Sequence, residues 1–258
     1  MITSASNMQM KNLVRLQKKG RARREQDVFV VEGMKMYREA PREFIEKVYI
    51  SKSFSEKAEA GELLGGRNVE VVDDRVFQNI SDTKTPQGIL AVIRRQHYTL
   101  EQVVGGEKPL VLVLENIQDP GNLGTILRTG EGAGVTGIVM SADTVDIYNP
   151  KTIRSTMGSV YRMPFCYAED MDQVMRNLKQ KGISVYAAHL KGSADYDAVD
   201  YRGSCGFLIG NEGSGLSERL AAQADGYIRI PMCGEVESLN AAVASAVLMY
   251  EAFRQRKS

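Results

Sequence analysis

The sequence predicts an α/β protein of two domains, a small N-terminal domain and a larger C-terminal domain built on a parallel sheet. Short apolar runs alternate with amphipathic segments along the chain, which is the pattern of strands alternating with helices. The run at 110–114 is apolar at every position, as expected for a strand buried on both faces. Between the two halves, the polar stretch 94–109 predicts a boundary, with domains at 1–99 and 107–258.

The N-terminal domain is expected to begin with a basic amphipathic helix at about 9–20. A strand at 27–33 should run into a helix through Tyr37, and a second helix at 56–64 should end at Gly65 and Gly66. Further strands are expected at 48–50, 69–72 and 89–93. These elements predict a small layered α/β unit.

The C-terminal domain is expected to alternate strictly between strands and helices. Its strands should lie at 110–114, 137–140, 183–188, 206–210 and 227–230, and its helices at 123–132, 171–181 and 216–224. Ser238 is expected to cap a long C-terminal helix rich in alanine. Strands that alternate with helices in this way predict a parallel sheet with helices on both faces.

The distribution of charge along the chain says more about a possible nucleic-acid partner than the net charge does. The 258 residues carry a formal net charge of only +1, which gives no indication of a nucleic-acid partner. The stretch 11–24, however, contains only basic charges: Lys11, Arg15, Lys18, Lys19, Arg21, Arg23 and Arg24. Such a cluster is either the solvated face of a helix or a site that grips phosphates.

Several classes of protein are disfavoured. The three cysteines form no C-x-x-C pair, and no close Cys/His cluster suggests zinc, so neither a disulfide framework nor a metal is expected. The longest apolar run, 241–250, is far shorter than the ~20 residues that span a bilayer. The N-terminus has no charged start followed by an apolar core. We therefore expect a soluble cytoplasmic protein.

The stretch 132–137 matches the G-x-G-x-x-G pattern of dinucleotide-binding proteins. That pattern binds a pyrophosphate when a strand enters the glycine turn and a helix leaves it. Here a helix is expected to enter and a strand to leave, so we reject a nicotinamide site at this position.

Three other segments combine polar groups with the ends of predicted strands or helices. The first holds Asn122 and Arg128, the second surrounds Glu212 with glycines, and the third contains Ser238 and Asn240 at the start of a helix. Each has a purely structural interpretation when it is taken alone, namely a helix cap with a surface arginine, a tight turn, and a capped core helix. Glycine lets backbone approach a ligand, and ligands of open α/β sheets bind at the carboxyl ends of the strands.

Taken together and in this order, the three segments resemble the SpoU family of the SPOUT methyltransferase superfamily, over about residues 107–258. The leading N-L-V-R-L-Q and F-V-V-E-G patterns look like the L30e-like substrate-binding domain often found ahead of it. The resemblance implies a deep trefoil knot at the C-terminal end of the catalytic domain. It also implies a homodimer formed through that domain, with an active site completed across the interface.

The resemblance implies that S-adenosylmethionine binds among the knot loops, largely through backbone groups. The positions in this sequence that match those loops are Gly210, Ile230, Met232 and Leu239, with Ala188 and His189 adding contacts. His189 is accordingly interpreted as a residue of a cofactor loop and not as a general base.

The implied reaction is methylation of a ribose 2′-hydroxyl of RNA, in ribosomal RNA more than in transfer RNA, and at a guanosine. Arg128 would make the hydroxyl nucleophilic, either as a base assisted by an RNA phosphate or by stabilising the alkoxide electrostatically. Asn122, Glu212, Ser238 and Asn240 would orient the ribose and the arginine. The basic stretch 11–24 would hold the RNA backbone in a salt-sensitive way.

Two other functions remain open on the sequence. One is a non-catalytic RNA-binding protein, such as a ribosome-assembly factor, that keeps the fold. The intact set of Asn122, Arg128, Glu212 and Asn240 disfavours it. The other is a related enzyme that methylates a base instead of a ribose, which would usually carry different motifs.

Overall fold

The structure is a computed structural model that describes residues 1–57, 59–189 and 194–257. Its contacts divide the chain into two compact units. Unit 1 comprises Met1–Gln96 together with Asp146–Tyr161, and unit 2 comprises His97–Val145 together with Arg162–Ser258. The segment 146–161 lies within the predicted second domain along the chain, but it groups with unit 1.

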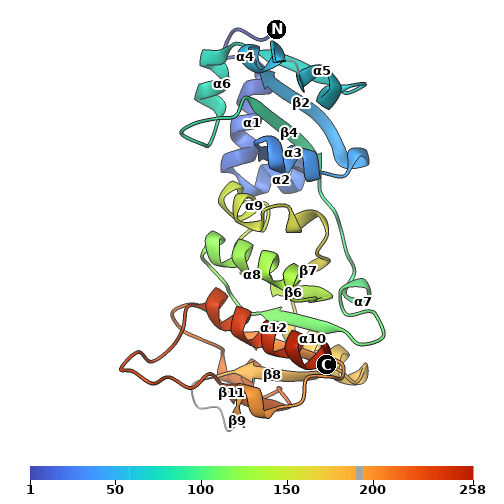
Figure 1. Cartoon of the computed structure of the whole chain (residues 1–258), viewed down its shortest axis with the longest axis vertical. Coiled ribbons are helices and arrows are strands. Elements are labelled where there is room, and N and C mark those ends of the chain that lie inside the picture. The colour runs from blue at the N-terminus through green and yellow to red at the C-terminus, as the bar shows by residue number, and fades with distance from the viewer. Residues whose placement is uncertain (58, 190–193, 258) are drawn as a thin grey trace. The chain divides into compact units, whose positions relative to one another are not determined.

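Unit 1 contains a four-stranded mixed sheet in the order β1-β4-β2-β3 (Figure 1). The strands are β1 (Val28–Glu32), β2 (Ile45–Ser51), β3 (Val69–Val72) and β4 (Ile89–Arg94). β4 runs antiparallel to both of its neighbours, whereas β2 and β3 are parallel. All four strands lie where the sequence places a strand, and β2 is longer than predicted.

The described helices of unit 1 include the three that the sequence predicts, with shifted ends, and others, such as α6 and α9, that it does not predict. They are α1 (Met8–Lys18), α2 (Gly20–Gln26), α3 (Met34–Glu39), α4 (Lys52–Ser55), α5 (Glu59–Leu64), α6 (Asp74–Ile80) and α9 (Pro150–Thr156), with 3-10 turns at Arg42–Phe44 and Ser159–Tyr161. The helix predicted at 9–20 ends at Lys18, because Lys19 has an extended backbone, and α2 follows. The helix predicted at 56–64 is confirmed as α5, which begins at Glu59 and ends at Leu64 as expected, and the short helix α4 precedes it.

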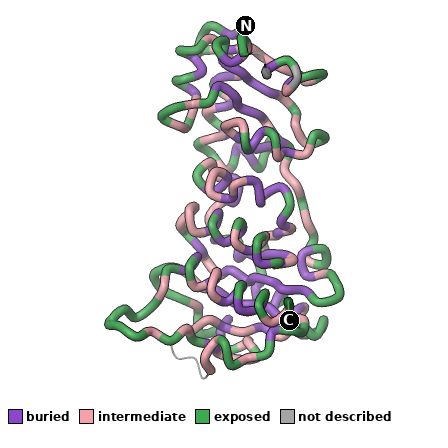
Figure 2. The backbone as a smooth tube through the Cα atoms, viewed as in Figure 1, coloured by how far each residue is buried: buried purple, intermediate pink, exposed green. Residues whose placement is uncertain are grey.

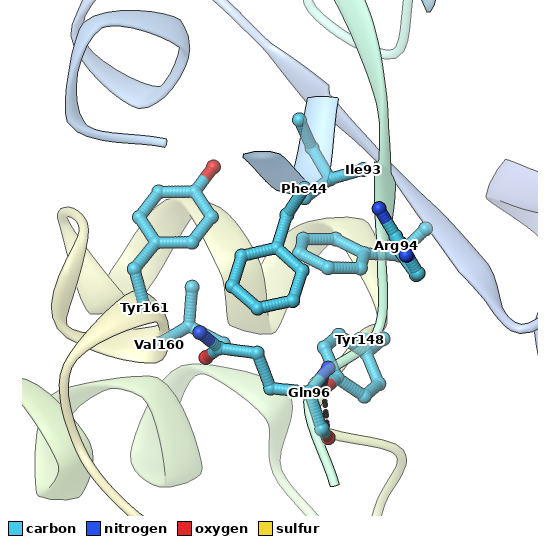
Figure 3. A pocket seen from close by; sticks show the side chains of 8 residues that line it. Phe44, Ile93, Arg94, Gln96, Tyr148, Val160 and Tyr161 are labelled. Atoms are coloured by element: carbon cyan, nitrogen blue, oxygen red, sulfur yellow. Dashed lines mark hydrogen bonds between the residues drawn. The ribbon is translucent and has the colours of Figure 1, made fainter. Parts of the chain in front are cut away.

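Segment 146–161 packs on the sheet of unit 1 through aromatic side chains. The rings of Phe29 and Tyr148 lie 4.5 Å apart, and the Tyr161 hydroxyl donates to the carbonyl of Met36 at 3.0 Å. Figure 3 shows the narrow crevice that remains between these side chains. It is lined by Phe29, Phe44, Ile93, Arg94, Gln96, Tyr148, Val160 and Tyr161. The Tyr148 hydroxyl closes one end of it by bonding both backbone groups of Gln96, at 3.1 and 3.2 Å.

Unit 2 contains a seven-stranded sheet in the order β7-β6-β5-β10-β8-β11-β9, and every neighbouring pair in it is parallel. The strands are β5 (Leu110–Leu114), β6 (Gly137–Ser141), β7 (Phe165–Ala168), β8 (Ser184–Ala188), β9 (Ala194–Asp195), β10 (Cys205–Ile209) and β11 (Gly226–Arg229). β10 lies between β5 and β8 although it follows both along the chain. The parallel α/β sheet is thus confirmed, and the trefoil knot stays a prediction.

Helices cover both faces of this sheet, as predicted. They are α7 (Leu100–Val103), α8 (Pro120–Gly132), α10 (Met171–Gln180), α11 (Glu218–Ala221) and α12 (Ala241–Lys257), with a 3-10 turn at Tyr196–Ala198. Val111 and Val113 of β5 pack with Val174 and Leu178 of α10. Because side chains alternate along a strand, the residues between them face the other side, where α12 contacts both β10 and α8. Figure 2 shows the central strands as buried.

Two local predictions are settled by the structure. The G-x-G-x-x-G stretch joins the end of α8 at Gly132 to the start of β6 at Gly137, so a helix enters it and a strand leaves, as expected. Ser238 does not cap the C-terminal helix. The cap is Asn240, whose Oδ1 accepts from the backbone N–H of Ala242 at 2.9 Å and of Val243 at 3.3 Å. Ser238 remains in the exposed loop before α12, because the helix begins three residues later than that residue.

In the described ranges of the chain, no helix combines the length and the apolar character needed to cross a membrane. The same residues contain no group of three or more His, Cys, Asp or Glu side chains that could hold a metal ion. The three cysteines, Cys166, Cys205 and Cys233, are unpaired.

Candidate active site

Parallel strands bring their following loops to one edge of the sheet of unit 2. β6, β5 and β10 are neighbours there, and on the other side of β10 lie β8 and β11. The first segment singled out from the sequence lies in α8, which follows the loop after β5. The second lies in the loop after β10, and the third lies in the loop between β11 and α12. The carboxyl edge of unit 2 is therefore where their polar side chains can meet.

Hydrogen bonds join all three segments at this edge. The carboxylate of Glu212, in the loop after β10, accepts from the backbone N–H groups of Gln118 and Asp119 and from Nδ2 of Asn122, each at 3.0 Å. Oδ1 of Asn122 in turn accepts from Nδ2 of Asn240 at 3.0 Å. We call Glu212, Asn122 and Asn240 the edge network. Residues 90 and 118 positions apart in the sequence are thereby fixed to one another.

The chemistry of the groups fixes the orientation of both amides in the edge network. An ionised carboxylate only accepts hydrogen bonds, so Asn122 must point its nitrogen at Glu212 and its oxygen at Asn240. Asn240 must then donate to Asn122 and use its own oxygen to cap α12. A single acid thus sets the direction of every bond up to the first turn of α12.

The same bonds keep Glu212 ionised. Burial raises the pKa of this carboxyl, but the hydrogen bonds from the Asn122 side chain and from the backbone of Gln118 and Asp119 outweigh it, and the pKa is lowered overall. Glu212 is consequently a fixed acceptor at neutral pH. It is poorly suited to act as a general base, because all of these donors favour its charged form.

The glycine-containing loop after β10 is held at both ends. Nδ2 of Asn211 donates to the carbonyl of Asn116 at 2.7 Å, and the backbone N–H of Ser217 donates to the Glu115 carboxylate at 2.7 Å. A Cβ atom on Gly210 would lie 2.2 Å from the backbone carbon of Gly215. Gly210 is therefore required by the folding of the loop on itself, in addition to any contact with a ligand.

Two residues predicted to be catalytic lie outside the edge network. Arg128 is six residues after Asn122 in α8, which places it about 9 Å further along the helix axis and on another face. Its side chain is exposed and forms no hydrogen bond or ion pair within the part of the chain that the structure describes. Ser238 is exposed as well, and it bonds to none of the described residues.

The residues predicted to bind a cofactor lie on the loops of three adjacent strands, β10, β8 and β11. They are Gly210, Ala188, His189, Ile230, Met232 and Leu239, and all of them are partly exposed. The backbone N–H of His189 donates to Ile228 at 2.9 Å, and its ring lies edge-on to Tyr227. Among described residues, the backbone groups of 231–239 form no hydrogen bond with the chain. The backbone donors and acceptors of this stretch are therefore not used by the described part of the chain itself.

The seven basic residues of 11–24, of which six lie in α1 and α2 and Lys19 lies between the two helices, fall into three groups. Arg23 is only 4% exposed, and its guanidinium bonds to Asp146 at 2.7 Å and to the carbonyl of Leu16 at 2.6 Å. Arg23 links α2 to α1 and to the segment 146–161 of unit 1, so the prediction that its side chain binds RNA is wrong. Arg15 and Arg21 both pair with Glu25. The remaining four, which are exposed and have no partner in the described chain, are Lys11, Lys18, Lys19 and Arg24.

Sequence reasoning missed the residues that support the edge network. Glu115, Asn116 and Gln118 follow β5 directly, and Ser141 ends β6. A signal was present, because polar residues that come immediately after a wholly apolar strand must lie at the edge of the sheet. Nothing in the sequence showed which of them would bond to the loop after β10.

Comparison with known proteins gives two matches to family models. Residues 109–250 match the SpoU rRNA Methylase family, and residues 7–91 match an MRM3-like substrate binding domain. A 23S rRNA (guanosine(2553)-2′-O)-methyltransferase, RlmP of Bacillus subtilis, is 33% identical over 252 residues, which cover 96% of this chain and 97% of that protein. A 23S rRNA (guanosine-2′-O-)-methyltransferase, RlmB of Xanthomonas campestris, is 32% identical over 74% of this chain and 79% of its own length.

Solved structures agree with these matches. An AdoMet-bound rRNA methyltransferase from Sinorhizobium meliloti superposes with a TM-score of 0.87 at 32% identity, covering 98% of this chain and 97% of that one. The SpoU methyltransferase AviRb from Streptomyces viridochromogenes, in complex with AdoMet, gives a TM-score of 0.89 at 26% identity, covering 98% and 99%.

Proposed function

The chain belongs to the SpoU rRNA methylase family, and on that premise we propose that it is an enzyme that transfers the methyl group of S-adenosylmethionine to a ribose 2′-oxygen of ribosomal RNA. The observation that carries the proposal is the edge network, since Glu212, Asn122 and Asn240 come from three separate segments and meet at one site.

The proposed substrate is 23S ribosomal RNA, at a guanosine. Two relatives that align over most of this chain are named for that RNA and that nucleoside. We assign RNA recognition to the N-terminal domain, residues 1–99, and catalysis to residues 107–258. Lys11, Lys18, Lys19 and Arg24 are the cations free to meet phosphates. A protein with this substrate would act in the cytoplasm.

The loops of the carboxyl edge fit S-adenosylmethionine. Gly210 and Met232 lie in the loops after β10 and β11, Ala188 ends β8 between these two strands, and the backbone of 231–239 forms no hydrogen bond with other described residues. A purine and a ribose are recognised well by such groups. Gly210, Ile230, Met232, Leu239, Ala188 and His189 are the residues that we propose to hold it. When bound, the cofactor supplies an electrophilic methyl group on a sulfonium.

In the proposed mechanism the protein positions the ribose and stabilises its oxygen. Glu212 holds Asn122, and Asn122 in turn holds Asn240, so both amides can orient the sugar; Ser238 lies two residues before Asn240. Arg128 is exposed and unpaired in the described chain, so its charge is available to stabilise the developing 2′-alkoxide. This role suits a guanidinium better than that of a base, because the group normally stays charged.

We further propose that the protein is a homodimer in which α12 contributes to the interface. Val243, Tyr250 and Phe253 are 49%, 48% and 37% exposed on this helix, which is an unusual degree of exposure for large apolar side chains. A second copy would cover these side chains. It would also let Arg128, which lies off the edge network of its own chain, complete a site across the interface.

The test is transfer of a labelled methyl group from S-adenosylmethionine to ribosomal RNA that lacks the modification, followed by mapping of the modified atom. We expect label at one ribose 2′-oxygen. The matched control is an RNA fragment with a 2′-deoxyribose at the mapped nucleotide, which should accept no label. Label that persists in the deoxy fragment would indicate a base methylase. RNA binding without any transfer would indicate an assembly factor.

A further inference from the structure

Asn116 has a backbone conformation that asparagine tolerates and most residues do not. It is the second residue after β5, and its φ of 55° lies in the left-handed region. Only glycine, asparagine and aspartate visit that region readily. The turn at Asn116 therefore aims its backbone groups in directions that an ordinary loop residue would not reach.

Those groups tie together the ends of three neighbouring strands, β6, β5 and β10. The backbone N–H of Asn116 donates to Oγ of Ser141, at the end of β6, at 2.8 Å. Its carbonyl accepts from Nδ2 of Asn211, just after β10, at 2.7 Å. Its own side-chain oxygen accepts from the side-chain amide of Gln118. Asn116 is thus bonded to the end of β6 and to the loop after β10, which carries Glu212.

Gln118 links this inner layer to the site itself. Its side chain donates to Asn116 and also to the carbonyl of Asp143 at 2.7 Å, which immobilises it. Its backbone N–H donates to Glu212 at 3.0 Å. A shift of the turn at Asn116 would therefore displace a donor of Glu212 through Gln118 and displace the loop bearing Glu212 through Asn211.

We propose that Asn116 is a positioning residue for methyl transfer, because its left-handed turn fixes the loop of Glu212 against the first turn of α8, which bears Asn122. The inference rests on the proposed function for its kinetic consequence. Asn116 acts only through other residues, and its loss should reduce the rate of the chemical step while leaving binding of the cofactor and of RNA nearly unchanged.

The first test compares Asn116→Val with Asn116→Gly. A β-branched residue is strongly disfavoured at positive φ, whereas glycine adopts it freely and keeps both backbone groups. We expect Asn116→Val to lower kcat by about tenfold to a hundredfold, as a misplacement near 1 Å would. The KM for RNA and the Kd for S-adenosylmethionine should change by less than about twofold. In Asn116→Gly, kcat should recover to within about threefold of the unmodified protein.

The matched control is Asp27→Val. Asp27 has nearly the same backbone conformation, with φ of 54°, but lies in unit 1. It should suffer the same strain without the loss of kcat. Equal losses in the two valine variants, or an unchanged kcat in a folded Asn116→Val, would overturn the proposal.

If Asn116→Val does not fold, Ser141→Ala is used in its place, because it removes the acceptor of the Asn116 N–H without backbone strain. An unchanged kcat in Ser141→Ala would overturn the proposal in the same way.

A second measurement needs no activity and so separates this inference from the proposed function. The carboxyl of Glu212 can be titrated by carbon NMR, with its signal assigned from Glu212→Gln. Its pKa is held low by donors that include Gln118. We expect the pKa to rise in Asn116→Val and to stay low in Asn116→Gly and Asp27→Val. An unmoved pKa in Asn116→Val would refute the positioning role even if no methyl transfer were ever observed.

Discussion

Two charged regions of this molecule use charge in opposite ways. At the carboxyl edge of unit 2, the single acid Glu212 is met by three donors, and each amide behind it is fixed. In the stretch 11–24 of unit 1, three of the seven basic residues pair with Glu25 or Asp146, and the other four have no partner in the described chain. The first arrangement is preorganised, as catalysis requires, whereas the second leaves free charge, as binding to phosphates requires.

The largest expected effect comes from Arg128, a cation of unit 2 that has no partner among the residues that the structure describes. Arg128→Ala should reduce turnover about a thousandfold, since removal of one donor that stabilises a developing oxyanion costs about that much. Affinity for S-adenosylmethionine, measured by calorimetry, should stay nearly intact. The control is Arg202→Ala, an exposed arginine of unit 2 that pairs with Asp200. Normal turnover in Arg128→Ala would remove the main catalytic assignment.

The second effect concerns the one basic residue of α2 that points inward. Arg23→Met should destabilise unit 1 by about 3 kcal/mol, because it leaves Asp146 without its partner in a largely buried place. Arg24→Met, one residue on and exposed, should change the free energy of unfolding by less than about 0.5 kcal/mol. Denaturant unfolding of both variants measures the difference. Equal stabilities would mean that Arg23 belongs with the free cations.

Arg23 also shows the limit of prediction for the fold. The periodicity of α1 correctly indicates that Leu13 and Leu16 face inward, because local spacing fixes which side of a helix is apolar. It says nothing about Asp146, which lies 123 residues away and belongs to a segment that the sequence assigns to the other domain. Elements and their faces were predictable from local pattern, whereas the partners of buried charges depend on how distant segments pack.

The sequence predicted which residues belong to the site better than it predicted the hydrogen bonds between them. Asn122, Glu212 and Asn240 were singled out because three motifs occur together, and the structure joins them by hydrogen bonds. Ser238 was predicted as a cap because serine favours that position, but Asn240 takes the role. Which of two nearby candidates forms a bond depends on distances of a few ångströms, and these follow only from the packed structure.

The third effect separates the unpaired basic residues of the stretch 11–24 from those that pair with Glu25. Changing Lys11, Lys18, Lys19 and Arg24 to glutamine should weaken RNA binding by at least about tenfold near physiological salt. It should also make the plot of log K against log salt concentration less steep by about 3, because each phosphate contact that is lost no longer contributes its released counterions. The matched double variant, Arg15→Gln with Arg21→Gln, removes cations that already share Glu25 and should change the slope less. An unchanged slope in the quadruple variant would exclude these helices as the RNA grip.

The smallest effect tests the preorganised edge through its dependence on pH. The folded-state pKa of Glu212 lies below its ordinary value of 4.5, so its bonds contribute stability above that pH. The contribution is lost as the pH falls through the folded-state pKa. Glu212→Gln replaces one carboxylate oxygen by an amide nitrogen, a donor that faces N–H groups. At pH 7 this should lower the free energy of unfolding by about 1 kcal/mol, since the side chain is partly exposed.

The gap in melting temperature between Glu212→Gln and the unmodified protein should therefore narrow as the pH falls below 4.5 and through the folded-state pKa of Glu212. Glu235→Gln, in the exposed loop before α12, should melt like the unmodified protein throughout. A gap that stays constant down to pH 3 would mean that the charge of Glu212 does not organise its donors. The carboxyl edge of unit 2 would then be ordered by backbone packing alone. The charge of Glu212 would have no organising role to set against the free charges of the stretch 11–24.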